Sequence, residues 1–245
     1  SYGGYRLSVY LPDPLAQGWY DHDWDPLPEI AALQLGRLRP AARVFDVGAH
    51  QGVVAAMLAN VVGPSGRVVA VEANGHNARA AAKNRDLNGL SQIEVVHAAA
   101  ADRPGTLTFN EGLNGQVDDG SGAWGRVTVD AVTLDSLADR FGPPDVVFLD
   151  VEGAEQRALA GAAGVLASGA AFFVEVHVGC GLETLGGTVP GVLAYFPDDR
   201  YDVQVRAEAD TSFRPLAAND PLTTDRFFLI ARRRDVPAAA ADGAS

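Results

Sequence analysis

The chain has 245 residues, a length that suits one domain with a full hydrophobic core. Its formal net charge of −12 argues against a nucleic-acid substrate, because phosphate contacts require clustered Lys and Arg. No apolar run reaches the roughly 18 residues that a membrane span needs, and no signal-peptide pattern is visible. The single cysteine, Cys180, excludes an internal disulfide and a cysteine-based zinc cage, and it fits a reducing, cytoplasmic compartment.

Residues 1–38 are expected to form an N-terminal arm that ends in a short helix. The arm is rich in aromatic and acidic side chains, and its prolines break regular structure. It could cap a ligand site or simply pack on the core, and the sequence leaves both readings open. Apolar residues between Leu27 and Leu38 predict the helix, with Pro28 near its start.

The stretch from Val44 to Gly52 has the pattern of a buried strand that runs into a glycine turn. A helix is expected at 53–62, and a second strand at 67–72 ends in an acid, Glu72. Strand, glycine turn, helix, strand and terminal acid form the first half of a nucleotide-binding α/β unit. The glycines let the turn bend tightly, and the acid can accept hydrogen bonds from two ribose hydroxyls.

The glycine spacing argues against a dinucleotide as the ligand. In the fingerprint G-x-G-x-x-G, the second Gly lets the backbone approach a pyrophosphate. Here the motif is D-x-G-x-x-x-G, formed by Asp46, Gly48 and Gly52, and His50 stands where the second Gly would be. A nucleoside with a small zwitterionic tail, such as S-adenosylmethionine, fits better. A plain strand–turn–helix of an α/β core is the alternative.

Apolar and turn patterns predict further elements in chain order: a helix at 77–87, a strand at 93–96, a strand at 106–109 that pairs with 127–129, a glycine-rich loop at 110–125, and a helix at 134–141. Small residues follow the strand at 93–96, from Ala98 to Ala101, just before Asp102. They would let a flat adenine ring lie against the backbone, or they could simply allow a tight strand exit.

A second informative stretch runs from Asp145 to Glu155. A wholly apolar strand ends in Asp150, followed by Glu152, a glycine and a helix that extends to about Leu166. Parallel strands that are buried on both faces have this pattern, and ligands in such sheets bind outside the carboxyl ends of the strands. The next strand, 171–177, also has a polar end, and the chain closes with an expected strand pair at 201–206 and 226–231.

Together these motifs resemble those of the FkbM-type methyltransferases, within the class I S-adenosylmethionine-dependent group. The resemblance spans about Trp24 to Ala231 and rests on these runs: Val44–Gly52, Val71–Ala73, Lys83–Asn88, Val132–Leu137, Phe148–Glu155 and Val174–His177. The chain departs from the family pattern in three places, which are His50 in place of the usual Asn, Ala73-Asn74 where Pro often follows the acid, and Leu149 where Lys is frequent.

The resemblance implies a Rossmann-like class I methyltransferase fold of the α/β class. This fold has a mostly parallel seven-stranded sheet with helices on both faces and an antiparallel C-terminal strand. The catalytic domain is expected at 39–234, behind the arm at 1–38. The Ala-rich, polar segment 235–245 is expected to be a disordered tail.

The resemblance also implies a set of cofactor-binding residues at the strand ends and in the turn: Asp46, Gly48, Ala49, His50, Gly52, Glu72, Ala73, Ala100, Asp102 and Asp150. Asp46 would bind the amino group of the cofactor and Glu72 its ribose hydroxyls. The turn at 48–52 would line the methionine portion, residues 99–102 would flank the adenine, and Asp150 would lie near the transferred methyl group.

Methyl transfer from a sulfonium is an in-line displacement that leaves S-adenosylhomocysteine and requires a base for the acceptor proton. The candidate catalytic residues are Asp150, Glu152 and His177, of which His177 best matches neutral pH. The same three side chains could belong to a Mg²⁺ site, which we do not favour, so no metal ligand is predicted. Glu155 is interpreted as a first-turn acid favoured by the helix dipole, and Glu175 as a wall of the substrate pocket.

The main expectation is therefore an O-methyltransferase of secondary metabolism that acts on a hydroxyl of a small metabolite, natural product or sugar. No nucleic-acid or membrane partner is expected, and a homo-oligomer is left open. Two alternatives remain. One is a nucleotide-dependent oxidoreductase of the NAD type, and the other is a non-catalytic adenosyl-ligand binder on the same fold.

Overall fold

The computed structural model describes residues 1–110, 126–217, 220, 222 and 226–234. Apart from Asn110, the glycine-rich loop expected at 110–125 lies outside these residues, as does the tail expected at 235–245. Within the described part of the chain, no helix is long and apolar enough to cross a membrane.

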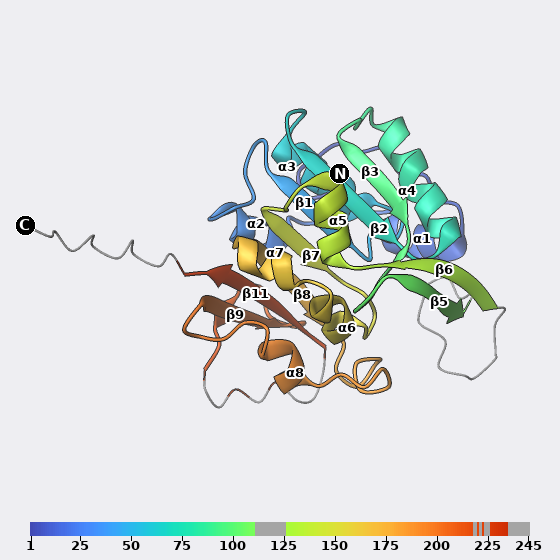
Figure 1. Cartoon of the computed structure of the whole chain (residues 1–245). Coiled ribbons are helices and arrows are strands. Elements are labelled where there is room, and N and C mark those ends of the chain that lie inside the picture. Colours follow the sequence, from blue (N-terminus) through green and yellow to red (C-terminus); the bar gives the residue numbers. More distant parts are fainter. Residues whose placement is uncertain (111–125, 218–219, 221, 223–225, 235–245) are drawn as a thin grey trace, which may run out of the picture.

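A large twisted sheet runs through the centre of the protein, in the order β10-β9-β11-β8-β7-β1-β2-β3 (Figure 1). Its strands are β1 (Arg43–Val47), β2 (Arg67–Glu72), β3 (Ile93–His97), β7 (Val146–Leu149), β8 (Ala171–Val176), β9 (Tyr201–Ala207), β10 (Arg214–Pro215) and β11 (Phe227–Arg233). Neighbouring strands from β8 to β3 pair in parallel, whereas β11 is antiparallel to both β8 and β9. The expected mostly parallel sheet with an antiparallel C-terminal strand is confirmed, and the two-residue β10 adds an edge strand to the expected seven.

The parallel register brings several strand ends to one edge of the sheet. Val47 at the end of β1 lies opposite Val71 of β2 and Leu149 of β7, and Leu149 lies opposite Val174 of β8. Because β11 runs the other way, its first residue, Phe227, also lies at this edge, opposite Val176. Residues that follow β1, β2, β7 and β8, and those that precede β11, therefore meet at the same place.

Helices cover both faces of the sheet (Figure 1). One layer contains α1 (Pro14–Tyr20), α2 (Pro28–Gln34), α3 (Val53–Val62) and α4 (Gly75–Leu87), and the other contains α5 (Leu134–Phe141), α6 (Glu155–Ala160), α7 (Ala163–Ser168) and α8 (Val189–Leu193). Within β1, Val44 packs into the first layer, and Phe45 and Val47 pack into the second. Burial of both faces explains why the central strands are apolar along their whole length.

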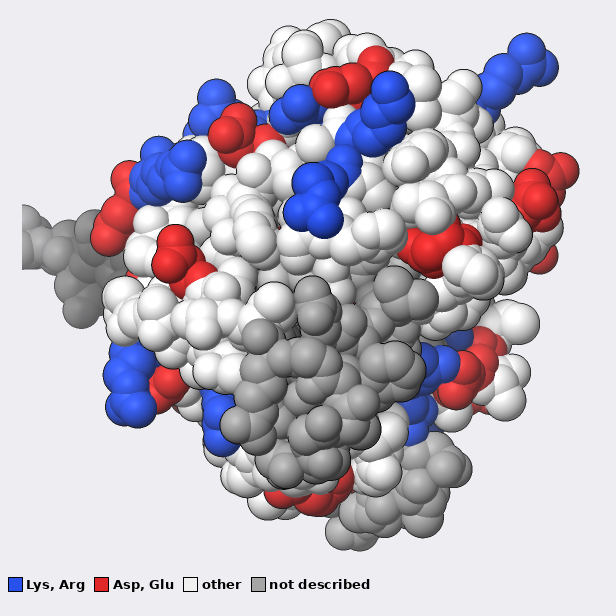
Figure 2. Space-filling view, turned by 90° about the vertical axis from the view of Figure 1, so that its right-hand side faces the viewer, with Lys and Arg blue, Asp and Glu red and all other residues white. Residues whose placement is uncertain are grey.

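A small second sheet has the order β4-β6-β5, with β4 (Ala99–Ala100), β5 (Gly105–Asn110) and β6 (Arg126–Val132). The antiparallel register of β5 and β6 pairs Leu107 with Val129, which confirms the pairing expected from sequence. On the face drawn in Figure 2, acidic and basic side chains of the described residues are intermixed and form no extended basic surface.

Two expected local structures were wrong. The first is the N-terminal arm, where residues 14–20 form α1 although prolines predicted irregular structure. Asp13 caps this helix by accepting a hydrogen bond from the Ala16 backbone N–H, and Pro14 occupies the first turn, where the missing N–H costs nothing. The second is the helix expected to reach Leu166, which breaks between α6 and α7. A Cβ on Gly161 would lie 2.3 Å from the carbonyl oxygen of Ala101, so the backbone there passes too close for a larger residue.

Candidate active site

A cavity of about 570 Å³ opens at the carboxyl edge of the large sheet, a size typical of small-molecule sites. Its walls include most of the residues that the sequence predicted for cofactor and catalysis: Asp46, Gly48, Ala49, His50, Glu72, Ala73, Ala100, Asp150 and Glu152. Gly52, Asp102 and His177 are not among its lining residues. The expected convergence of acids from β1, β2 and β7 is therefore present in the fold.

Glu72, the last residue of β2, is held in a fixed orientation by two backbone donors. Its Oε2 accepts from the N–H of His50 at 2.7 Å, and its Oε1 accepts from the N–H of Asn74 at 2.7 Å. Asn77 adds a side-chain hydrogen bond to this carboxylate, so three of its roughly four acceptor sites are used within the protein and one remains for a ligand hydroxyl. Burial raises the pKa of Glu72 to about 7 even though both backbone hydrogen bonds favour the ionised form.

Asp46 lies inside β1 with its carboxylate at the cavity. Its side chain is buried, and Oδ2 has no hydrogen-bond partner in the protein. Burial raises the pKa of Asp46 to about 7. A buried carboxylate without a partner is costly, so this group has the character of a ligand-binding residue in the absence of its ligand.

The variant Asp46→Asn is expected to raise the melting temperature of the ligand-free protein at pH 8 and to raise it by less at pH 5. Because burial raises the folded-state pKa from 3.8 to about 7, the stability from this group is full below pH 3.8 and is lost as pH rises through about 7. A gain of about 2–4 °C at pH 8 corresponds to about 1 kcal/mol. Calorimetry at both pH values tests this, with Asp130→Asn as an exposed control. A lower melting temperature at pH 8 would contradict the expectation.

Backbone hydrogen bonds hold the turn after β1 against the end of β2. The N–H groups of Gly48 and Ala49 both donate to the carbonyl of Val71, at 2.9 and 3.0 Å, and the N–H of Gly52 donates to the carbonyl of Ala49. Since the N–H of His50 donates to Glu72, these donors are already used within the protein. In a dinucleotide site such groups would face a pyrophosphate.

Gly48→Ala is expected to destabilise the protein by more than about 3 kcal/mol. Gly48 has a φ of +88°, and a Cβ there would lie 1.6 Å from the carbonyl oxygen of Asp150. Gly63→Ala is a matched control, because Gly63 also has a positive φ, +69°, but its Cβ would meet nothing within 4 Å. This control should cost about 1–3 kcal/mol, from backbone strain alone. Urea unfolding measures the free energy of unfolding of both variants. Equal decreases would show that the short distance to the Asp150 carbonyl does not contribute.

His50 links the turn to the N-terminal arm. Its Nδ1 lies 2.6 Å from the hydroxyl of Tyr20, and its backbone has a φ of 48°, unusual for a residue other than glycine. Burial lowers the pKa of His50 to about 4, and burial also raises the pKa of Tyr20, so both groups are neutral at physiological pH. The direction of this hydrogen bond sets the tautomer: if the Tyr20 hydroxyl donates to Nδ1, the imidazole proton lies on Nε2. That atom is buried and has no partner in the protein, so in this tautomer it is a donor for a ligand.

The N-terminal arm is both packed on the core and part of the cavity wall, so the two readings left open by the sequence hold together. Trp19 and Tyr20 contact the His50 ring at centroid distances of 5.1 and 5.7 Å, and Trp24 also lines the cavity. Asp13 fastens the arm, because its Oδ2 lies 2.8 Å from both Gln51 Nε2 and His76 Nε2. The turn after β1 and the N-terminal arm are thus joined by direct contacts.

An acidic group surrounds His177 where β7 and β8 end. The imidazole Nε2 lies 3.6 Å from Asp150 Oδ1, 3.5 Å from Glu152 Oε2 and 3.5 Å from Glu175 Oε1. Asp150, Glu152 and Glu175 line the cavity, whereas His177 lies behind them and is buried. Burial and the neighbouring carboxylates, first Glu175, raise the pKa of Asp150 well above its ordinary value, although His177 opposes this shift.

Glu155 is the buried partner of His177, so its interpretation as a first-turn acid was incomplete. Its Oε1 lies 2.7 Å from His177 Nδ1 and accepts a hydrogen bond from the N–H of Gly153. Burial alone would lower the pKa of His177, but the hydrogen bond to Glu155 and the surrounding carboxylates raise it to about 9. In the protein without ligands His177 is therefore protonated at neutral pH, which weakens the idea that it is the base that best matches pH 7.

The far end of the cavity combines aromatic walls with paired charges. Phe173 lies 4.8 Å from Phe148 and is stacked on Phe228 at 6.0 Å, measured between ring centroids. Arg226 forms an ion pair with Glu175 at 2.9 Å, and a second buried pair joins Arg206 to Glu29 at 3.3 Å. This end can accept an amphipathic ligand with an apolar body and polar substituents.

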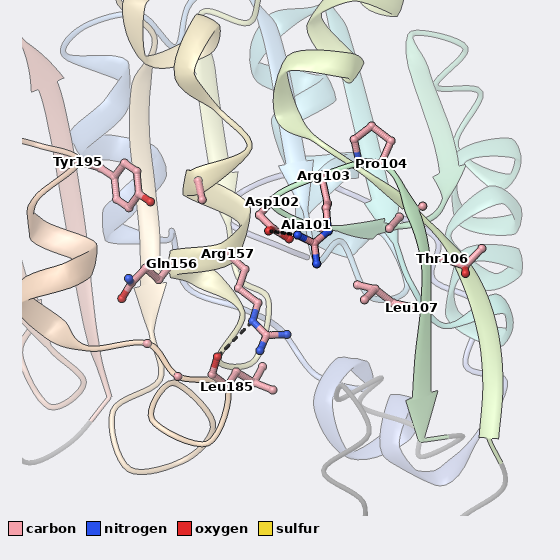
Figure 3. A pocket seen from close by; sticks show the side chains of 15 residues that line it. Ala101, Asp102, Arg103, Pro104, Thr106, Leu107, Gln156, Arg157, Leu185 and Tyr195 are labelled. Atoms are coloured by element: carbon pink, nitrogen blue, oxygen red, sulfur yellow. Dashed lines mark hydrogen bonds and ion pairs between the residues drawn. The ribbon is translucent and has the colours of Figure 1, made fainter.

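Asp102 and Gly52 do not line the cavity that holds most of the other predicted cofactor residues. Asp102 is exposed, lies 3.7 Å from Arg103, and lines a separate cavity of about 480 Å³ together with Arg157 (Figure 3). The reason is β4, which ends at Ala100 and pairs with β6, so the chain turns away from the large sheet before Asp102. Gly52 acts in packing instead, since a Cβ there would lie 2.9 Å from Ala81 of α4.

Sequence reasoning missed several residues at the site, among them Glu155, Tyr20, Arg206 and Arg226. Glu155 and Tyr20 act through contacts with residues far along the chain, for which the sequence gives no signal. Arg226 could have been found, because it directly precedes an antiparallel strand whose start must lie at the carboxyl edge of the sheet.

The comparison with protein families finds the Methyltransferase FkbM domain, which matches residues 46–184, more than half of the chain. The matched segment contains Asp46, Glu72, Asp150 and His177. A comparison with curated proteins finds no match.

Solved structures of methyltransferases share the fold at low sequence identity. A putative rRNA-methylase from Clostridium thermocellum matches with a TM-score of 0.52 and 14% identity, over 84% of this chain and 93% of that one. An O-methyltransferase from Bacillus cereus in complex with SAH matches with a TM-score of 0.52 and 18% identity, over 89% and 86%. Methyltransferase FkbM from Methylobacillus flagellatus KT matches with a TM-score of 0.50 and 19% identity, over 78% of this chain but 43% of that one. These likenesses establish a Rossmann-like class I methyltransferase fold.

Proposed function

The chain belongs to the methyltransferase FkbM family and is an S-adenosylmethionine-dependent methyltransferase, and from this premise we propose that it methylates a hydroxyl of a small-molecule acceptor. The observation that carries the proposal is Glu72, a buried carboxylate at the cavity whose two oxygens are each fixed by one backbone N–H. Asn77 adds a side-chain hydrogen bond, and the acceptor site that remains would take a ribose hydroxyl.

The remaining cofactor contacts follow from the position of Glu72. Asp46, whose Oδ2 has no protein partner, would take the ammonium group of the methionine portion. Nε2 of His50 has no protein partner, and in the tautomer that carries its proton there it would donate to the carboxylate of that portion. Ala73 and Ala100 would offer small side chains beside the adenine, and Asp150 lines the same cavity. Asp102 is excluded from this assignment because it lies in the other cavity.

The chemistry needs a base as well as alignment. The bond between sulfur and the methyl carbon breaks as the acceptor oxygen attacks, and the acceptor loses its proton to a protein group. Asp150 and Glu152 face the cavity, and the raised pKa of Asp150 makes it a stronger base than an ordinary carboxylate. His177 lies behind them and would stabilise their charges, since its own pKa is raised to about 9 in the absence of ligands.

The turn after β1 argues against the NAD-dependent alternative. A pyrophosphate needs free N–H groups at the glycine turn. The N–H groups of Gly48 and Ala49 donate to Val71, and that of His50 donates to Glu72. We therefore expect NAD to bind weakly or not at all.

Calorimetric titration with S-adenosylhomocysteine and with NAD, followed by an acceptor screen with a labelled methyl donor, tests the proposal. We expect saturable binding of S-adenosylhomocysteine, no comparable binding of NAD, and label transferred to a hydroxyl-bearing compound. Tighter binding of NAD would overturn the proposal. Binding of S-adenosylhomocysteine with transfer only to nitrogen or carbon nucleophiles would overturn the O-methyl assignment.

A further inference from the structure

Three side chains at the ends of β7 and β8 converge on a single point: Asp150, Glu175 and His177. One ligand atom from each of them lies within 4.8 Å of the other two. We propose that these three residues bind a divalent transition-metal ion at the wall of the cavity. The donor atoms are one imidazole nitrogen and two carboxylate oxygens.

Two of the three ligand atoms, on His177 and Asp150, have no hydrogen-bond partner, whereas Oε1 of Glu175 is paired with Arg226 at 2.9 Å. His177 is 2% exposed, and its Nε2 is buried without a hydrogen bond. Oδ1 of Asp150 is likewise buried and has no hydrogen bond. The distances from Nε2 to Asp150 and Glu175, 3.6 and 3.5 Å, are longer than the roughly 2.7–3.2 Å of an N–H···O hydrogen bond. Nε2 of His177 and Oδ1 of Asp150 are therefore buried next to each other without forming a hydrogen bond.

The same distances suit ligands of one ion. Bonds from a divalent metal to imidazole nitrogen and carboxylate oxygen are about 2.0–2.2 Å long. Two ligand atoms on such an ion are thus separated by about 3 Å when adjacent and by about 4.2 Å when opposite. The measured 3.5 and 3.6 Å fall between these values. An ion at the centre would give Nε2 of His177 and Oδ1 of Asp150 the partner that they lack, and Glu175 would share its charge between the ion and Arg226.

Glu155 gives His177 the support that metal-binding histidines usually have. Its Oε1 lies 2.7 Å from Nδ1, so the ring is held with Nε2 directed at Asp150 and Glu175. A carboxylate behind the imidazole fixes its orientation and increases the basicity of the ligating nitrogen. This contact explains why an acid is fully buried at the start of α6.

The charge around the site also favours a cation. Asp150, Glu152, Glu155 and Glu175 surround His177, and Arg226 beside Glu175 is shared with Glu208. Glu152, whose backbone has a φ of 51°, lies 3.5 Å from Nε2 and is within reach as a fourth ligand. Because one donor is an imidazole, ions such as Mn²⁺, Fe²⁺ or Zn²⁺ fit this set better than Mg²⁺.

An ion held here would lie beside the position proposed for the acceptor. It could bind the acceptor oxygen and lower the pKa of its hydroxyl, and this consequence rests on the proposed function. Metal binding itself does not depend on that function, so the two can fail separately.

Titration of the chelator-treated full chain with Mn²⁺, followed by electron paramagnetic resonance of the free ion, tests the site. We expect one saturable site per chain and a Mn²⁺-dependent rise in melting temperature. Glu175→Gln should weaken binding at least ten-fold, and His177→Gln should do the same. Glu94→Gln makes the same chemical change on an exposed residue of β3 and should bind Mn²⁺ like the unmodified chain.

Absence of saturable Mn²⁺ binding would overturn the proposal, as would unchanged binding in Glu175→Gln. If His177→Gln fails to fold, Glu175→Gln decides, because Glu175 lies at the cavity wall rather than beneath it. Co²⁺ provides an independent readout, since its visible absorption should change in Glu175→Gln if this residue is a ligand. Binding of S-adenosylhomocysteine measured on the same samples shows whether the cofactor assignment holds when the metal assignment does not.

Discussion

Replacing Glu72 by Ala is expected to weaken the binding of S-adenosylhomocysteine at least about 100-fold. A charge-assisted hydrogen bond to the ribose, worth about 1.5–3 kcal/mol, is lost. The N–H groups of His50 and Asn74, which donate to Glu72 at 2.7 Å, would also be left without an acceptor. Isothermal titration calorimetry measures the change, and Glu94→Ala on the neighbouring strand is the exposed control.

The same carboxylate predicts a pH dependence of cofactor binding. The pKa of Glu72 is raised by burial to about 7 in the protein without ligand, and the ribose hydroxyls require the ionised form. Affinity should therefore fall as pH decreases below about 7 and level off above it, and the Glu72→Ala variant should lose this part of the dependence. Binding that is unchanged by the substitution at pH 8 would remove Glu72 from the cofactor site.

Replacing Asp150 by Asn is expected to lower kcat about 10²–10⁴-fold, while the affinity for S-adenosylhomocysteine changes little. The carboxylate lies at the cavity, and its pKa is raised by burial and by Glu175, so its loss removes the strongest candidate base. Asn keeps the shape but cannot take a proton. Methyl transfer kinetics together with calorimetry separate the two effects, with Asp130→Asn as an exposed control.

The opposite pattern, a large loss of affinity with kcat preserved, would make Asp150 a cofactor ligand. A small effect on both quantities would move the base to Glu152 or to another group at the cavity. Mn²⁺ titration of the same variant shows whether its loss of activity accompanies loss of the proposed metal ion.

The large sheet and its functional edge were predictable, because strands buried on both faces have a distinct sequence pattern. Apolar runs that end in Asp150 and Glu72 show both where each strand stops and which polar group follows it. Parallel pairing then brings such groups together wherever they lie in the chain. This rule explains why Asp46, Glu72 and Asp150 line one cavity as expected.

Features that depend on contacts between distant elements were not predictable. The family resemblance implied that Asp102 flanks the adenine. Because β4 pairs with β6, Asp102 lines another cavity. Glu155 reads as an ordinary helix-start acid until His177, 22 residues later, is placed next to it. The role of Tyr20 depends on its contact with His50, to which no local pattern points.

A crystal structure of the protein with S-adenosylhomocysteine is the most direct measurement of the arrangement on which these assignments depend. It should show the ribose bonded to Glu72, the amino group at Asp46, and the sulfur directed toward Asp150. A ligand bound elsewhere, with these three carboxylates in contact only with water, would contradict the account.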